Sequence, residues 1–135
     1  MKILVIGANG QLGTDICHLL EKEGTDFLPI THKDIEITEM DSVEVALLKH
    51  KPELVINTAA FVRVDECEPY PDEGFKVNAL GARNVAVVTQ KIGAKLVLIS
   101  TDYVFGKDSS RDRPYTEFDE PSPINALGRS KLAGE

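Results

Sequence analysis

The chain has 135 residues, 42% of them hydrophobic and 27% charged, a balance typical of one globular domain and not of disordered or fibrous proteins. Its 22 acidic and 15 basic side chains give a formal net charge of -7, which repels nucleic-acid phosphates and anionic lipid, so we expect neither as a partner. The first apolar run is far shorter than the ~18 residues of a membrane span and no secretion signal follows it, so a cytoplasmic protein is expected.

Short apolar runs bounded by turn residues alternate with amphipathic segments of helical length. Buried strands are predicted at Ile3–Ile6, Phe27–Ile30, Leu54–Ile56 and Leu96–Ile99. Helices are predicted at Leu12–Glu23, Met40–His50 and Phe75–Ile92. Strands that alternate with helices require crossover connections and a parallel sheet, so the pattern predicts an α/β, Rossmann-like, doubly wound fold with its ligand at the carboxyl ends of the strands.

Residues 101–126 interrupt this alternation with three prolines and many charged side chains, which predicts an irregular loop that acts as a lid or a binding segment. A helical pattern resumes near Ala126, and the sequence stops at Glu135 without a capping signal. We therefore expect one incomplete nucleotide-binding domain over residues 1–135, whose sheet stops after its fourth or fifth strand and whose substrate domain is absent. An uncovered sheet edge can pair with another chain, so a homodimer is an expected state.

A glycine motif, Gly7-Ala8-Asn9-Gly10-Gln11-Leu12-Gly13, lies between the first predicted strand and the first predicted helix. In this context glycines allow a tight turn, the approach of a pyrophosphate to backbone N–H groups, and close packing of helix on strand. The motif predicts a dinucleotide site. The residues expected to bind the dinucleotide are Gly7, Asn9, Gly10, Gln11, Leu12 and Gly13.

The turn after the second strand bears on the choice between NADP(H) and NAD(H). His32 and Lys33 are cations at the place where a 2′-phosphate is bound, which favours NADP(H). Asp34 follows directly and could instead accept hydrogen bonds from a ribose hydroxyl, which would favour NAD(H). Both cofactors therefore remain open.

Small and hydroxyl side chains follow the third and fourth strands. Ala59 and Ala60 would let a cofactor lie close to the backbone. Ser100 and Thr101 come where a nicotinamide and a substrate carbonyl would meet, so one hydroxyl can hydrogen-bond a reacting oxygen. Cys17 and Cys67 fit no metal-ligand or redox spacing, so we predict structural thiols and no metal site.

These segments together resemble the dTDP-4-dehydrorhamnose reductase family, which belongs to the extended short-chain dehydrogenases. The similar segments are residues 7–13, 36–38, 57–60, 64–68, 77–78, 100–105, 114–117 and 128–131. The run Ser100 to Phe105 is the most specific of them, because related sugar-nucleotide dehydratases and epimerases carry a different sequence after this strand. The resemblance extends over essentially the whole chain.

The resemblance implies a reductase that passes a hydride from NAD(P)H to the 4-keto sugar of a dTDP-4-dehydro-6-deoxy-sugar nucleotide, a step of dTDP-L-rhamnose biosynthesis. It implies that Thr101 holds the keto oxygen and that Lys131 binds the nicotinamide ribose and lowers the pKa of a catalytic tyrosine. The family's tyrosine position, four residues before the lysine, holds Leu127. The resemblance further implies that Glu36, Ile37 and Asn78 bind the cofactor and that Asp102 and Tyr103 contact the substrate.

Leu127 has no proton to donate to the reduced carbonyl, and loss of a positioned acid typically costs about 10²–10⁴-fold in rate. Tyr103 and Tyr115 match other family positions, and the amide of Asn125 is not a useful acid. We therefore predict an inactive chain. The alternative is a non-catalytic NADP-binding module that resembles the regulatory subunit of methionine adenosyltransferase. A different sugar-nucleotide reductase or epimerase is a weaker alternative, because the sequence from Ser100 to Phe105 disfavours it.

Overall fold

A computed structural model of the chain describes residues 1–108 and 110–135. In chain order, the elements are β1 (Ile3–Ile6), α1 (Gln11–Lys22), β2 (Phe27–Ile30), α2 (Met40–His50), β3 (Leu54–Asn57), α3 (Val64–Cys67), α4 (Pro71–Phe75), the π-helix η1 (Lys76–Gly81), α5 (Ala82–Lys91), β4 (Lys95–Leu98), the 3₁₀ helix η2 (Asp102–Val104) and α6 (Ala126–Gly134). Within the described ranges, no helix has the length and apolar character that crossing a membrane requires.

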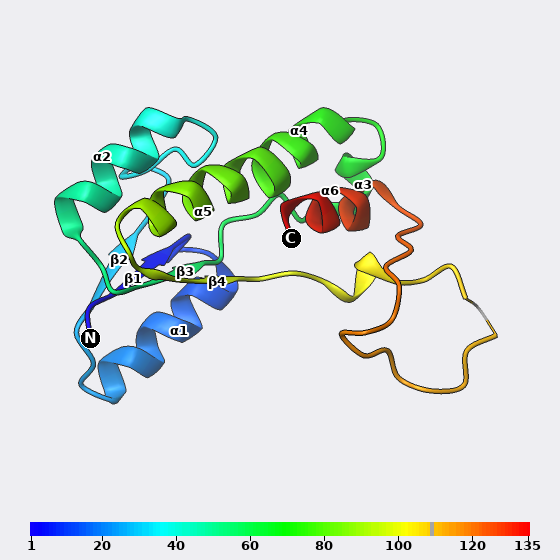
Figure 1. Ribbon diagram of the computed structural model, residues 1–135, viewed down its shortest axis with the longest axis horizontal. Coiled ribbons are helices and arrows are strands. Elements are labelled where there is room, and N and C mark those ends of the chain that lie inside the picture. Colours follow the sequence, from blue (N-terminus) through cyan, green and yellow to red (C-terminus); the bar gives the residue numbers. More distant parts are fainter. Residues whose placement is uncertain (109) are drawn as a thin grey trace.

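All four strands are parallel and lie in the order β2-β1-β3-β4. The chain steps from β1 to β2 on one side and then crosses back to β3 on the other side of β1. Helix α1 covers one face of this sheet, whereas α2 and α5 lie on the opposite face (Figure 1). The predicted Rossmann-like doubly wound fold is confirmed, and the reversal between β1 and β3 marks the place where such sheets bind ligands.

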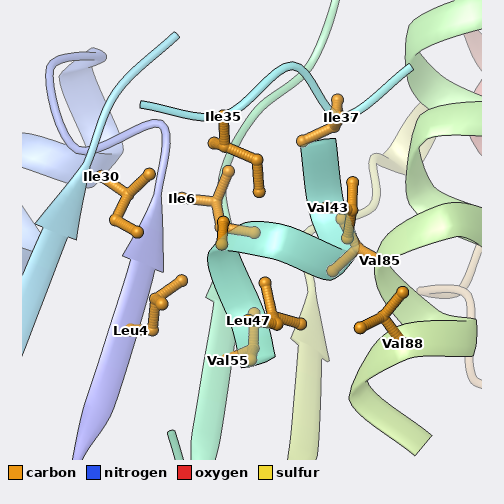
Figure 2. Packing of buried hydrophobic residues seen from close by; sticks show 11 residues of the cluster. Leu4, Ile6, Ile30, Ile35, Ile37, Val43, Leu47, Val55, Val85 and Val88 are labelled. Atoms are coloured by element: carbon orange, nitrogen blue, oxygen red, sulfur yellow. The ribbon is translucent and has the colours of Figure 1, made fainter. Parts of the chain in front are cut away.

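Two apolar clusters hold the helices to the sheet, one on each face. Figure 2 shows the larger cluster, in which strand, α2 and α5 side chains interlock. Its labelled members are Leu4, Ile6, Ile30, Ile35, Ile37, Val43, Leu47, Val55, Val85 and Val88. On the other face, Ile3 and Val5 pack with Ile16 and Leu20 of α1. Alternate residues of β1 thus point to opposite faces, and both faces are apolar, as in a strand buried between helices.

The third predicted helix differs from the observed one at its start and in its geometry. Helix begins at Pro71, whose ring suits the first helical turn, and passes from α4 through a π-helical segment into α5, which ends at Lys91. Gly81, in the π-helical segment, lies so close to Ile37 that an added Cβ would come within 2.8 Å of Ile37 Cδ1. The apolar periodicity did not reveal this start or this change of pitch, and it did not predict the single turn of α3.

The segment after η2 is irregular, as predicted, but its side chains brace it internally. Phe105 and Tyr115 stack with ring centroids 4.4 Å apart, and the Arg111 guanidinium lies 4.0 Å from the Tyr115 ring centre. Arg111 Nη2 also donates to Asp119 Oδ2 at 2.6 Å. These contacts hold Phe105 and the described residues from Arg111 to Asp119 together.

Candidate functional site

Two hollows lie side by side along the carboxyl edge of the sheet. One, of about 440 Å³, extends toward the residues after β2, and the other, of about 500 Å³, extends toward the end of β4 and α6. Both are lined by Gly10, Thr58 and Ala60. They therefore form one groove that crosses the β1–β3 reversal, and we name its two ends the β2-side hollow and the β4-side hollow.

Each of the three motif glycines is suited to its position for a different structural reason. Gly7 has φ +79°, and a Cβ there would lie 2.7 Å from Thr58 Oγ1 and 2.9 Å from Ala59 N. A Cβ on Gly13 would overlap Gly7 O and lie 2.9 Å from Ala8 Cα, so α1 can pack on β1 only without one. Gly10 has an ordinary φ of −77°, and only Gly7 O, at 3.2 Å, is near an added Cβ. Its open side is therefore the side that faces the groove.

Backbone N–H groups at the start of α1 are available to a ligand in this groove. The first helical hydrogen bond is donated by Thr14 N to Gly10 O at 2.9 Å, and no side chain caps the helix. The amides of Gln11, Leu12 and Gly13 precede that bond, and these residues line the β4-side hollow. Such a helix start favours an anion, so the geometry fits the pyrophosphate of a dinucleotide at Gly10.

Glu36 is held in an ordered turn of the β2-side hollow, which it lines together with Asn9, His32 and Ile37. Its Oε1 accepts hydrogen bonds from Thr38 Oγ1 at 2.8 Å and from Thr38 N at 3.1 Å. These bonds hold the pKa of Glu36 below its usual value, and the nearby His32, whose Nε2 lies 3.3 Å from Glu36 Oε2, adds to the effect if it is protonated. The hollow therefore contains an ionised carboxylate near the place where a ribose would lie.

Two other predicted residues of this turn do not line the hollow. Asp34 Oδ2 accepts hydrogen bonds from Thr31 N and Thr31 Oγ1, each at 2.9 Å, and these bonds lower the pKa of its carboxyl group. Lys33 also lies outside the lining of both hollows. The cation that does line the β2-side hollow with His32 is Lys76, from η1, together with Glu73. Sequence reasoning missed Lys76, because nothing in the helical pattern around it distinguishes it from a solvated surface lysine.

Asn78 lies behind the groove and connects its walls. Its Oδ1 accepts from Phe61 N at 2.8 Å, and its Nδ2 donates to Phe61 O at 2.8 Å and to Ser130 Oγ at 2.9 Å. The side chain is only 4% exposed and lines neither hollow, whereas Ala59 and Ala60 do line the groove. Asn78 therefore ties the chain after β3 to α6 and does not face a ligand directly.

Thr101 and Lys131, the two residues to which the resemblance assigns catalytic roles, both line the β4-side hollow. Lys131 Nζ donates to Ile99 O at 2.8 Å, and burial lowers the pKa of its ammonium group. Thr101 Oγ1 lies 3.2 Å from Asp102 Oδ1 and accepts a 3.3 Å bond from Tyr103 N, so it caps η2. Asp102 and Tyr103 themselves do not line this hollow.

Leu127 borders the same hollow one turn of α6 before Lys131 and is 4% exposed. It packs in an apolar cluster with Cys67, Phe61 and Val64. Asn125 is engaged elsewhere, because its Oδ1 accepts from Gly128 N at 2.7 Å as the N-cap of α6. The hollow that Thr101 and Lys131 line thus has an apolar wall at Leu127, the position at which the resemblance implies a tyrosine in the family. Among the described residues, no group of three or more His, Cys, Asp or Glu side chains could hold a metal ion.

Several curated proteins and solved structures are similar to this chain over nearly its whole length. The spore coat polysaccharide biosynthesis protein SpsK of Bacillus subtilis is 40% identical over 99% of the chain, which covers 47% of that protein. The dTDP-4-keto-6-deoxy-D-glucose reductase of Streptomyces niveus is 42% identical over 98% of the chain, which covers 45% of that protein. The chain thus spans about half the length of these relatives.

Among solved structures, the dTDP-4-dehydrorhamnose reductase of Bacillus anthracis in complex with NADP is similar, with a TM-score of 0.92 and 44% identity. The match covers 98% of this chain and 47% of that one. Residues 1–135 also match the family described as the RmlD substrate binding domain. Since this match includes every residue, the chain belongs to the RmlD substrate-binding-domain family.

Proposed function

We propose that this chain is the NAD(P)-binding part of a reductase that acts on a dTDP-4-dehydro-6-deoxy-sugar nucleotide. The observation that carries the proposal is the continuous groove, which has Gly10 at its middle and a hollow at each end. The backbone N–H groups at the start of α1, which make no intrahelical hydrogen bond, lie beside Gly10. The pyrophosphate would lie at Gly10, the adenosine in the β2-side hollow and the nicotinamide in the β4-side hollow. The NADP complex of a 44% identical reductase supports this assignment.

Each polar residue of the β4-side hollow has a role in the proposal. Lys131 holds the nicotinamide ribose, and its bond to Ile99 O fixes the direction of its ammonium group. Thr101 offers its hydroxyl to the keto oxygen of the sugar, and a bound NAD(P)H supplies the hydride. A sugar alcohol forms only when the oxygen also gains a proton, and Leu127 cannot provide one.

A second candidate function is a cofactor-binding module without turnover, and the environment of Leu127 favours it. Its side chain is 4% exposed and packs with Cys67, Phe61 and Val64, so the position is filled by apolar packing and not by an acid. Both candidates require cofactor binding, and they differ in whether the oxygen of the substrate can be protonated.

Cofactor binding is tested by titrating the purified chain with NADPH and with NADH, followed by nicotinamide fluorescence and by calorimetry. We expect saturable binding of NADPH, and of NADH as the weaker ligand. If neither NADPH nor NADH bound at millimolar concentration, both candidate functions would be refuted.

Turnover is tested with four proteins: the chain, its Leu127→Tyr variant, and both of these fused to the carboxyl half of a family reductase. Each is assayed with NADPH and dTDP-4-dehydro-L-rhamnose. We expect no activity from the two short proteins, because the sugar is not held in reacting geometry, and at least a hundredfold faster reduction by the mutated fusion than by the unmutated one. Equal rates of the two fusions would show that a different group or a water donates the proton.

A further inference from the structure

We infer that Lys76 recognises the 2′-phosphate of the adenosine ribose, so that this lysine, and not the turn directly after β2, sets the preference for NADP(H) over NAD(H). The inference rests on the proposed binding of a dinucleotide in the groove. It adds a residue that decides which dinucleotide binds.

Lys76 reaches the β2-side hollow from a part of the sequence distant from the glycine motif. It is the first residue of the π-helical segment, a helix geometry that is frequent at functional sites. It lines the hollow together with His32 and Glu36, which follow β2. A lysine from the helix layer therefore borders the hollow in which the adenosine would lie.

The ammonium group of Lys76 is not committed to another residue. Within residues 1–108 and 110–135, no carboxylate lies within 4.0 Å of its Nζ, whereas Lys91 is paired with Glu44 and Arg111 with Asp119. Its charge nevertheless contributes to lowering the pKa of Glu36, after the larger effect of the Thr38 hydrogen bonds. Lys76 thus lies close enough to the carboxylate of Glu36 to influence it and is free to bind an incoming anion.

The other charges of the hollow make this lysine decisive. Glu36 and Glu73 both line the hollow, so removal of Lys76 would leave two carboxylates and the imidazole of His32. A 2′-phosphate carries negative charge and would be repelled by that set, whereas a 2′-hydroxyl can donate a hydrogen bond to Glu36. The same hollow therefore suits NADP(H) with the lysine and NAD(H) without it.

Lys33 is the competing candidate, since it lies next to His32 in the sequence. Its side chain lines neither hollow, and its backbone N–H donates to Thr31 Oγ1 at 3.3 Å within the turn. The two lysines carry the same charge but differ in position relative to the groove, which gives a direct comparison.

The test is a set of NADPH and NADH titrations on the unmutated chain and on Lys76→Gln, Lys33→Gln and Lys76→Arg. Lys49→Gln, an exposed lysine of α2 outside the groove lining, is the matched charge control. We expect Lys76→Gln to raise the dissociation constant of NADPH about tenfold, which corresponds to about 1.4 kcal/mol, and that of NADH less than twofold. Lys76→Arg should keep the preference, and Lys33→Gln should behave as the control does.

Salt gives an independent measurement. Because the lysine is exposed, the preference of the unmutated chain for NADPH should decrease as NaCl is raised, and that of Lys76→Gln should change less. Thermal unfolding verifies that each variant is folded. Equal weakening of both cofactors by Lys76→Gln, or a loss of preference in Lys33→Gln alone, would overturn the inference while leaving cofactor binding in place. If the unmutated chain bound neither cofactor, the proposed function would fail as well.

Discussion

Substitutions at Gly10 and at Gly13 should separate ligand binding from folding. Gly10 has φ −77° and ψ 170°, an extended conformation that any residue can adopt, and its only close neighbour would be Gly7 O at 3.2 Å. In Gly10→Val the added carbons therefore project into the groove where the pyrophosphate would lie. The fold should lose only about 1 kcal/mol, from the poorer N-cap.

Gly13→Ala is the matched variant in which the added carbon meets the protein itself. The new Cβ would overlap Gly7 O and lie 2.9 Å from Ala8 Cα, both of which are backbone atoms that cannot rotate away. Overpacking of this kind costs about 1–3 kcal/mol, and a clash with backbone belongs at the upper end of that range. At about 4 °C per kcal/mol for a domain of this size, a loss of about 3 kcal/mol lowers the melting temperature by roughly 12 °C.

The assay combines urea unfolding with NADPH titration on both variants and on the unmutated chain. Gly10→Val should unfold at nearly the same urea concentration as the unmutated chain and bind NADPH at least about a hundredfold more weakly, which corresponds to about 2.7 kcal/mol. Gly13→Ala should unfold much earlier. If Gly10→Val bound NADPH within threefold of the unmutated chain, the assignment of the pyrophosphate to Gly10 would be refuted.

Two further substitutions test the supports of the β4-side hollow. Asn78→Ala removes three hydrogen bonds of a buried side chain and leaves Phe61 N, Phe61 O and Ser130 Oγ without this partner. Urea unfolding should show that the unfolding free energy falls by about 2–4 kcal/mol. A decrease below about 1 kcal/mol would contradict this role of Asn78. Burial lowers the pKa of Lys131 below its usual value of 10.5. Between the lowered pKa and 10.5, the unfolded chain therefore binds more protons than the folded chain does. The unfolding free energy should rise with pH across that window. Urea unfolding of Lys131→Met at several pH values should lack this part of the rise; an identical pH dependence in both proteins would contradict it.

The sheet and the glycine turn could be predicted from the sequence because their signals are local. The first two strands and α2 were predicted with their observed bounds, since apolar runs and turn residues delimit them. β4 begins at Lys95, one residue earlier than predicted, because Lys95 pairs with Leu54 and its N–H bonds to Glu53 O. A charged residue at a strand start carries no apolar signal, so pairing alone sets this boundary.

The side chains that face a ligand were harder to predict than the strands that carry them. Asp34 and Lys33 lie at the expected place in the chain, yet Asp34 turns back to Thr31 and Lys33 lies outside the groove. Proximity in sequence does not fix which way a turn residue points. Lys76 lines the groove because α4 and η1 pass over the carboxyl edge of the sheet, and this depends on tertiary packing that no local pattern encodes.

The contacts that hold α6 in place are largely independent of the Leu127 side chain. α6 is held by the Asn125 cap and by the bond from Asn78 to Ser130, and Ala126 N donates to Glu68 Oε1 at 2.6 Å. These contacts involve backbone and neighbouring side chains, and none of them involves the side chain at position 127. The helix therefore has supports other than the Leu127 side chain, and it places positions 127 and 131 at the β4-side hollow. A larger side chain at position 127 must therefore compete for space with the cluster of Cys67, Phe61 and Val64, and under the proposed function this is the position at which a proton donor would have to be restored.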